Sequence, residues 1–140
     1  MGQTAQKINP FLMFFGQAEE AIQLYTSIFD DSRIDKVTRF GDVGIPVAPG
    51  EEQKVLHAIF SLKGQSFMCI DNLDKQHKHS FTPALSLFVT CDTEEELERV
   101  FDQLSVGGAV LMPLAESPVS AKFGWVQDRY GVSWQLNLPK

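Results

Sequence analysis

No stretch of this 140-residue sequence approaches the about 18 consecutive apolar residues that a membrane-spanning helix needs. The first residues also lack the pattern of a cleavable signal peptide, so we expect a cytoplasmic protein without a membrane partner. Basic residues are few, since 12 Lys and Arg stand against 18 Asp and Glu and give a net charge of −6. With no basic stripe anywhere in the chain, nucleic acid is not an expected partner.

Cysteine is scarce as well. Cys69 and Cys91 are the only two, and each stands inside an apolar run of the kind found in strands. We therefore expect two buried thiols in a reducing compartment rather than a disulfide. The hydrophobic fraction of 44% is ordinary for a folded protein, and the length fits a single compact domain.

Apolar periodicity predicts the order of helices and strands. A first helix is expected over residues 18–29. A second begins after Thr93, which forms a capping-box pattern with Glu96, and ends before Gly107. Residues 41–53 hold three Gly and two Pro and predict a long loop. Strands are expected over 8–15, 33–40, 54–62, 65–71, 84–91 and 109–114, with a final hairpin in 123–138.

The final hairpin is the most informative stretch. Asp128 to Gly131 form its turn, and the returning run alternates between large apolar and neutral polar residues. Because alternate residues of a strand face opposite sides, one side packs in the core and the other carries Ser133, Gln135 and Asn137. That polar but uncharged side suits a lined cavity, and it equally suits an ordinary solvated surface.

The element order repeats. Strand, helix, strand, strand, strand occurs over about 8–71 and again over about 84–138, so we expect one domain of two βαβββ modules. A step of 75 residues superimposes the first two elements, and a step of 67 aligns the turn glycines later in each half. These steps match Leu12 with Leu87, Phe14 with Val89, Ile22 with Leu97, Ser66 with Ser133, Phe67 with Trp134 and Met68 with Gln135.

A doubled βαβββ unit resembles the vicinal-oxygen-chelate superfamily of glyoxalases, bleomycin-resistance proteins and dihydroxybiphenyl dioxygenases. Residues 16–25, 32–34 and 123–135 are similar to its PhnB-like branch, which is often labelled a demethylubiquinone methyltransferase domain. The resemblance implies an α+β fold in which each module curves its sheet around a cavity. It also implies a homodimer.

The resemblance has consequences for metal binding. In the metalloenzymes of the superfamily, His or Glu ligands stand on the first and last strands of each module. Here those places are held by Pro10 or Phe11, Met68, Leu85 or Ser86, and Gln135. None of these side chains is an imidazole or a carboxylate, so we expect no bound metal and no cofactor.

His57, Ser66, Met68, Trp125, Ser133 and Gln135 are the candidate cavity residues. A two-residue turn at Lys63-Gly64 would pair Ile59 with Met68 and place His57 on the same face. His57 is either a general acid or base or a structural, hydrogen-bonded histidine. His77 and His79, two residues apart in a polar loop, suggest a solvated loop more than a metal site.

These observations favour a protein that binds a small molecule in its cavity without a metal. The first alternative is an enzyme of glyoxalase or dioxygenase type that uses a metal or His57. A methyltransferase is a weaker alternative, because the chain has no Gly-rich strand-to-helix turn and its element order favours antiparallel sheets.

The small size of each module predicts a homodimer. Modules of this length bury little core on their own, and open sheets leave edges that need covering. Light scattering at micromolar concentration should give the mass of two chains, and a clean monomer mass would refute the prediction. The loop over residues 41–53 is the expected arm across the partner, so a shortened loop should weaken the dimer.

Overall fold

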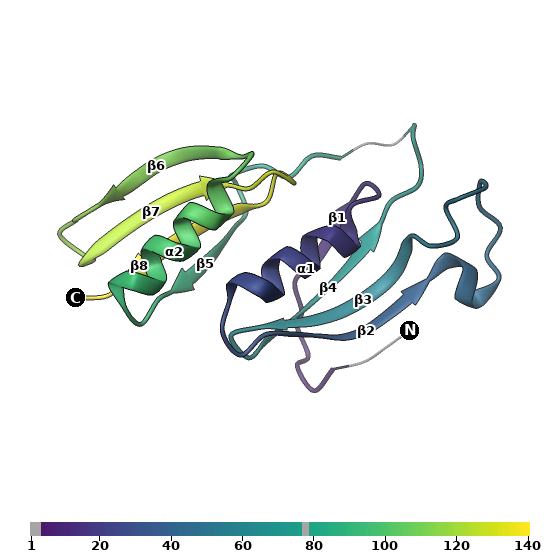
Figure 1. The fold of residues 1–140 in the computed structure, drawn as a ribbon, viewed down its shortest axis with the longest axis horizontal. Coiled ribbons are helices and arrows are strands. Elements are labelled where there is room, and N and C mark those ends of the chain that lie inside the picture. Colours follow the sequence, from purple (N-terminus) through teal and green to yellow (C-terminus); the bar gives the residue numbers. More distant parts are fainter. Residues whose placement is uncertain (1–3, 77–78) are drawn as a thin grey trace. The chain divides into compact units, whose positions relative to one another are not determined.

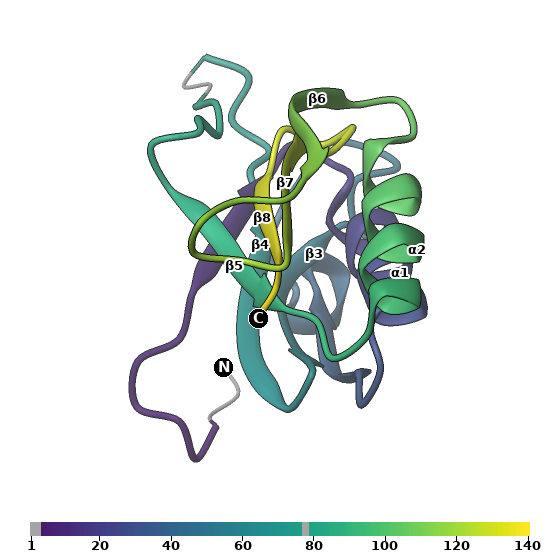
Figure 2. The same cartoon turned by 90° about the vertical axis from the view of Figure 1, so that its left-hand side faces the viewer.

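The computed structural model describes residues 4–76 and 79–140. The chain separates into two compact units, an N-terminal unit over residues 1–78 and a C-terminal unit over residues 79–140. In each unit one helix lies against one face of a four-stranded sheet (Figure 1 and Figure 2). Among the described residues, no helix is both long and apolar enough to span a membrane.

The N-terminal unit follows the predicted order of elements. Its sheet has the strand order β1-β4-β3-β2, with β1 parallel to β4 and the other pairs antiparallel. The elements are β1 (Phe11–Phe14), α1 (Ala18–Ile28), β2 (Arg33–Arg39), the single 3-10 turn η1 (Phe40–Val43), β3 (Val55–Leu62) and β4 (Gln65–Asp71).

The C-terminal unit repeats this plan. Its strand order is β5-β8-β7-β6, and β5 is parallel to β8 as β1 is to β4. The elements are β5 (Ser86–Thr90), α2 (Glu94–Ser105), β6 (Ala109–Ala115), β7 (Lys122–Gln127) and β8 (Ser133–Leu138). The predicted α+β fold of βαβββ modules is confirmed. The expectation of antiparallel sheets is wrong for the pairs β1–β4 and β5–β8, which are parallel. A helix and two strands lie between the two members of each pair, and this connection is long enough to bring the chain back in the same direction.

Strand pairing also corrects the repeat. Met68 pairs with Phe11 in one sheet, whereas Gln135 pairs with Phe88 in the other. If Met68 and Gln135 are equivalent, Phe11 corresponds to Phe88 and the step in the first strands is 77 residues rather than 75. The matches of Leu12 with Leu87 and of Phe14 with Val89 are therefore wrong by two residues. Apolar character repeats every second residue along a strand, so a shift of two leaves the pattern unchanged.

Two predicted local motifs, the Lys63-Gly64 turn and the capping box at Thr93, are present in the structure. Lys63 and Gly64 both have positive φ, 50° and 80°, as a two-residue hairpin turn requires, and they pair Leu62 with Gln65. At the start of α2, the Thr93 hydroxyl accepts the Glu96 N–H at 3.1 Å. The Glu96 carboxylate in turn accepts the N–H of Asp92, one residue before the capping residue.

Each helix buries one apolar face against its sheet. Tyr25 of α1 is fully buried together with Phe60 of β3, and the Phe67 ring of β4 packs against that of Phe60, tilted by 42° with ring centroids 5.5 Å apart. In the C-terminal unit Gly124 lets α2 approach β7, since an added Cβ would lie 2.8 Å from Phe101. The buried hydrophobic residues of this second core are Cys91, Leu97, Val100, Leu104, Val126, Val132, Trp134 and Leu136.

One buried aspartate fixes the chain path in each unit. Asp71 at the end of β4 is 1% exposed and accepts the backbone N–H groups of Gly16, Ala18 and Val55, each at 2.9 Å. Asp71 thereby joins the start of α1 to β3 and β4. Asp128 fixes the β7–β8 loop in a similar way. It accepts two loop N–H groups and the indole N–H of Trp134, the latter at 2.8 Å.

We expect Asp71→Ala to lower the free energy of unfolding by at least about 3 kcal/mol, because three buried backbone donors lose their acceptor. Urea denaturation measures the loss. Glu20→Ala, on the exposed side of α1, is the matched control and should change stability by less than about 0.5 kcal/mol. A loss below about 1 kcal/mol for Asp71→Ala would show that these bonds do not hold the unit together.

Candidate ligand-binding site

The side of each sheet that faces away from its helix is called here the open face. In the C-terminal unit Gln135 stands at the centre of this face, paired with Trp125 on β7 and with Phe88 on β5. The neighbouring position Gly124 packs under α2, so Trp125 points to the opposite side. Three adjacent strands therefore present an indole, an amide and a phenyl ring side by side.

A chain of hydrogen bonds fixes the Trp125 ring. Its indole N–H donates to the Ser133 hydroxyl at 2.7 Å, and that hydroxyl lies 2.7 Å from the Ser86 hydroxyl. Ser86 in turn donates to the Pro83 carbonyl at 3.3 Å. Either serine hydroxyl can be the donor of the bond between them, and in both cases the Ser133 oxygen accepts the indole N–H and holds the tryptophan in place.

The Gln135 amide has the opposite character. It is partly exposed and makes no side-chain hydrogen bond to any residue that the structure describes. An amide offers both a donor and an acceptor, so it can meet a ligand hydroxyl or carbonyl. The strand positions on this face carry no charged side chain; they are Ser86, Phe88, Thr90, Ala109, Met112, Ala115, Phe123, Trp125, Gln127, Ser133, Gln135 and Asn137.

Two aromatic rings extend the site beyond Trp125. Phe88 is 58% exposed, although it stands in the middle of a strand, and its ring centroid lies 6.4 Å from that of Phe123. Both rings line a pocket of about 420 Å³ whose polar edge is Asn137, held by the Ser120 hydroxyl. Phe88 thus leaves a large apolar ring exposed at the edge of this pocket.

The open face of the N-terminal unit holds the other three candidates. Met68 pairs with Ile59, Ser66 pairs with Ser61, and His57 pairs with Thr38 of β2. The predicted sharing of one face by His57, Ser66 and Met68 is therefore confirmed by the register. The six candidates fall into two groups, one in each unit.

Unlike its counterpart, this second face carries charges. Arg33, Asp35 and Lys36 of β2 line a pocket of about 510 Å³ together with Ser61 and Ser66. A hydrogen bond from Arg33 and another from the Ser61 hydroxyl hold the pKa of the Asp35 carboxyl below its usual range. Sequence reasoning missed this pocket, because a bulge in β2 brings Asp35 and Lys36 beside each other on it.

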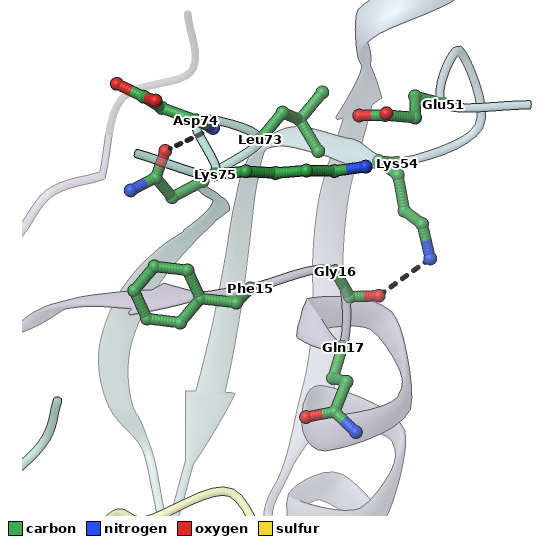
Figure 3. Close-up of a pocket in the computed structure, with 9 residues that line it drawn as sticks. Phe15, Gly16, Gln17, Glu51, Lys54, Leu73, Asp74 and Lys75 are labelled. Atoms are coloured by element: carbon green, nitrogen blue, oxygen red, sulfur yellow. Dashed lines mark hydrogen bonds between the residues drawn. The ribbon is translucent and has the colours of Figure 1, made fainter. Parts of the chain in front are cut away.

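A further pocket of about 570 Å³ lies at the start of α1, and Figure 3 shows Lys54 reaching across it to the Gly16 carbonyl at 2.8 Å. Two N–H groups at this helix end, those of Gly16 and Ala18, are already bonded to Asp71. Lys75 on the rim is accompanied by Glu51 and Asp74. The pocket therefore has mixed charge, and a carboxylate already occupies the start of the helix. Sequence reasoning did not find it, because loops far apart in sequence form it.

The remaining reactive side chains lie outside these sites. Neither cysteine forms a disulfide and both are buried, and burial raises the pKa of the Cys69 thiol to about 12, which leaves it protonated. His79 is exposed in the loop before β5. His77 lies outside the described residues.

The model of one protein family, described as 3-demethylubiquinone-9 3-methyltransferase, matches residues 6–137. The chain belongs to this family. A solved structure described as a putative 3-demethylubiquinone-9 3-methyltransferase, PhnB protein, from Bacillus cereus is 56% identical and covers 95% of this chain and 99% of its own, with a TM-score of 0.86. The resemblance to the PhnB-like branch is thus confirmed.

Two further structures show how far the similarity extends. Protein PA1353 from Pseudomonas aeruginosa is 30% identical, with coverage of 96% and 98% of the two chains and a TM-score of 0.84. A glyoxylase/bleomycin resistance protein/dioxygenase domain from Frankia sp. EAN1pec is 16% identical, with coverage of 99% and 94% and a TM-score of 0.64. This last likeness shows the fold alone, which is that of the vicinal-oxygen-chelate superfamily.

The strand register identifies which residues occupy the positions where the metalloenzymes of the superfamily hold their ligands. Phe88, and not Leu85 or Ser86, is the residue beside Gln135, so the four positions become Phe11, Met68, Phe88 and Gln135. They offer one thioether and one amide, which are poor ligands for a divalent cation. Within residues 4–76 and 79–140 no three His, Cys, Asp or Glu side chains gather closely enough to hold a metal.

We expect elemental analysis of tag-free protein to find less than about 0.1 divalent metal per chain, since a stable site needs three or more suitable ligands. Treatment with EDTA should leave the melting temperature unchanged. One Zn, Ni, Mn or Fe per chain, lost with EDTA and restored by that metal, would contradict the assignment.

Proposed function

We propose that this PhnB-like protein binds a flat, neutral small molecule on the open face of its C-terminal unit, without a divalent metal. The observation that supports this function best is the composition of that face. Trp125, Phe88 and Gln135 stand side by side on strands whose other open-face positions are all uncharged. A charged ligand would lose its hydration there and find no opposite charge in return.

The arrangement suits a ring that carries one polar group. The Trp125 ring is held in position before any ligand arrives, so little side-chain entropy is lost on binding. Stacking on such a ring contributes about 0.5–1.5 kcal/mol beyond the area it buries. A hydrogen bond from Gln135 adds about 0.5–1.5 kcal/mol and selects for a hydroxyl or a carbonyl.

The methyltransferase named in the family description is a weaker alternative. The quinone precursor in that description is a flat ring of the proposed class, which supports the binding half of such a reaction. A phosphate or carboxylate of a methyl donor would favour a helix N-terminus, however, and both ends here are acidic. Asp71 occupies the start of α1, and α2 begins with three glutamates.

A glyoxalase- or dioxygenase-type enzyme is the other alternative. The superfamily reactions use metal ligands that the positions Phe11, Met68, Phe88 and Gln135 do not supply. The metal-free variant of this alternative depends on His57, which has no second titratable group bonded to it among the described residues. Binding is therefore the function that the side chains support best.

We also propose that the protein works as a homodimer. The edge strand β6 leaves Val110, Leu111 and Met112 exposed by 38–49%, and an apolar edge of this kind is normally covered by a partner. The second copy of the chain is the occupant that the sequence resemblance implies.

Calorimetric titration with 2-naphthol tests the proposed function, since this probe is a flat neutral ring with one hydroxyl. We expect saturable binding that Trp125→Ala and Gln135→Leu each weaken by at least about tenfold, which corresponds to about 1.4 kcal/mol. Gln103→Leu, on the exposed side of α2, is the matched control and should bind as the wild type does.

A charged analogue provides the second arm. The ring of 2-naphthoate has the same shape but carries a carboxylate, so we expect it to bind at least about tenfold more weakly than 2-naphthol. Tighter binding of the naphthoate, or equal binding of 2-naphthol by all four proteins, would refute the proposed site.

A further inference from the structure

His57 combines two properties that rarely occur together. It is only 2% exposed, and its Nδ1 atom has no hydrogen-bond partner among the described residues. Buried polar atoms in folded proteins are nearly always hydrogen-bonded, because an unpaired one loses its hydrogen bonds to water and gains none within the protein. An unpaired atom of this kind marks either a cost to stability or a place reserved for a ligand.

The surroundings of His57 favour a neutral imidazole. Burial lowers the pKa of His57, and the Lys36 ammonium on the neighbouring strand lowers it further. The side chains facing it from β1 and β4 bear no charge, since the positions there are Phe11, Met13, Met68 and Ile70. A neutral imidazole has one nitrogen that donates and one that accepts, and its Nδ1 is available for either role.

An aromatic side chain packs beside the ring. Phe11 lies with its ring centroid 5.8 Å from that of His57, tilted by 42°, and is itself 48% exposed. It belongs to β1, a four-residue strand at the edge of the sheet. Because Phe11 is half-exposed on the face away from the helix, its side chain can rotate and make room beside the imidazole without disturbing the core on the helix side.

We propose that Nδ1 of His57 accepts a hydrogen bond from the hydroxyl of a neutral aromatic molecule, bound on the open face of the N-terminal unit with Phe11 as its movable cover. The aromatic body replaces or stacks on the Phe11 ring, and Ile59 and Met68 form the floor. This second subsite rests on the proposed function only for the class of ligand, a neutral aromatic molecule. It uses no residue of the Trp125 site.

The stability cost gives the first test. His57→Leu removes the unpaired nitrogen and keeps a similar volume, so we expect its melting temperature to rise by about 3 °C. His79→Leu makes the same change at an exposed position and should leave the melting temperature within about 1 °C of the wild type. A lower melting temperature for His57→Leu would show that Nδ1 has a partner within the fold, and would overturn the proposal.

The direct test uses nitrogen-15 NMR of the histidine rings in tag-free wild-type protein. Phenol should move the Nδ1 resonance of His57 upfield in a saturable way, while the other histidines stay unchanged. Anisole keeps the ring and the oxygen but lacks the O–H, and should leave the resonance where it was. His57→Leu should weaken phenol binding by at least about tenfold, and His79→Leu should not.

An unmoved His57 resonance, or an equal shift with anisole, would overturn the subsite. Titration of Gln135→Leu with phenol separates this result from a failure of the proposed function. If that variant still shows the His57 shift, the two sites are independent. If 2-naphthol binds at Trp125 while phenol leaves His57 unmoved, the proposed function stands and this inference falls.

Discussion

The structure of each unit depends on a buried carboxylate that accepts backbone N–H groups. Asp71 collects three of them from the start of α1 and of β3, and therefore fixes where the helix crosses the sheet. Asp128 holds the β7–β8 loop and the buried edge of Trp134 in the same manner. A buried polar group in such a position is stable only when its hydrogen bonds are complete, so each aspartate enforces one chain path. The path in turn decides which side chains the helix covers and which remain on the open face.

The two open faces have the same frame and different chemistry. Each has a half-exposed phenylalanine on its first strand beside a residue of its last strand, Phe11 with Met68 and Phe88 with Gln135. The C-terminal face adds a fixed tryptophan and no charge, whereas the N-terminal face adds an unpaired histidine and a charged rim. The positions that could have held a metal are filled with aromatic, thioether and amide groups. A conserved frame with exchanged side chains is how one fold serves unrelated functions.

Much of this could be predicted from the sequence. Period-2 alternation in residues 132–138 separated Trp134 from Gln135, and the Lys63-Gly64 turn alone fixed the pairing of Ile59 with Met68. The parallel pairs and the two-residue slip of the first strands could not be predicted, since neither changes the apolar pattern. The roles of Asp71 and Ser133 depend on partners 53 and 47 residues away. The unpaired state of His57 is likewise a property of three-dimensional packing, and no spacing in the chain signals it.

The most direct test of the account locates the ligand on the open face. Crystals of the protein soaked with 6-bromo-2-naphthol would show the bromine by its anomalous scattering. We expect one dominant peak beside the Trp125 ring, with the naphthol oxygen within hydrogen-bond distance of the Gln135 amide. A dominant peak on the helix side of either sheet, or one that needs a bound metal ion beside it, would contradict the account.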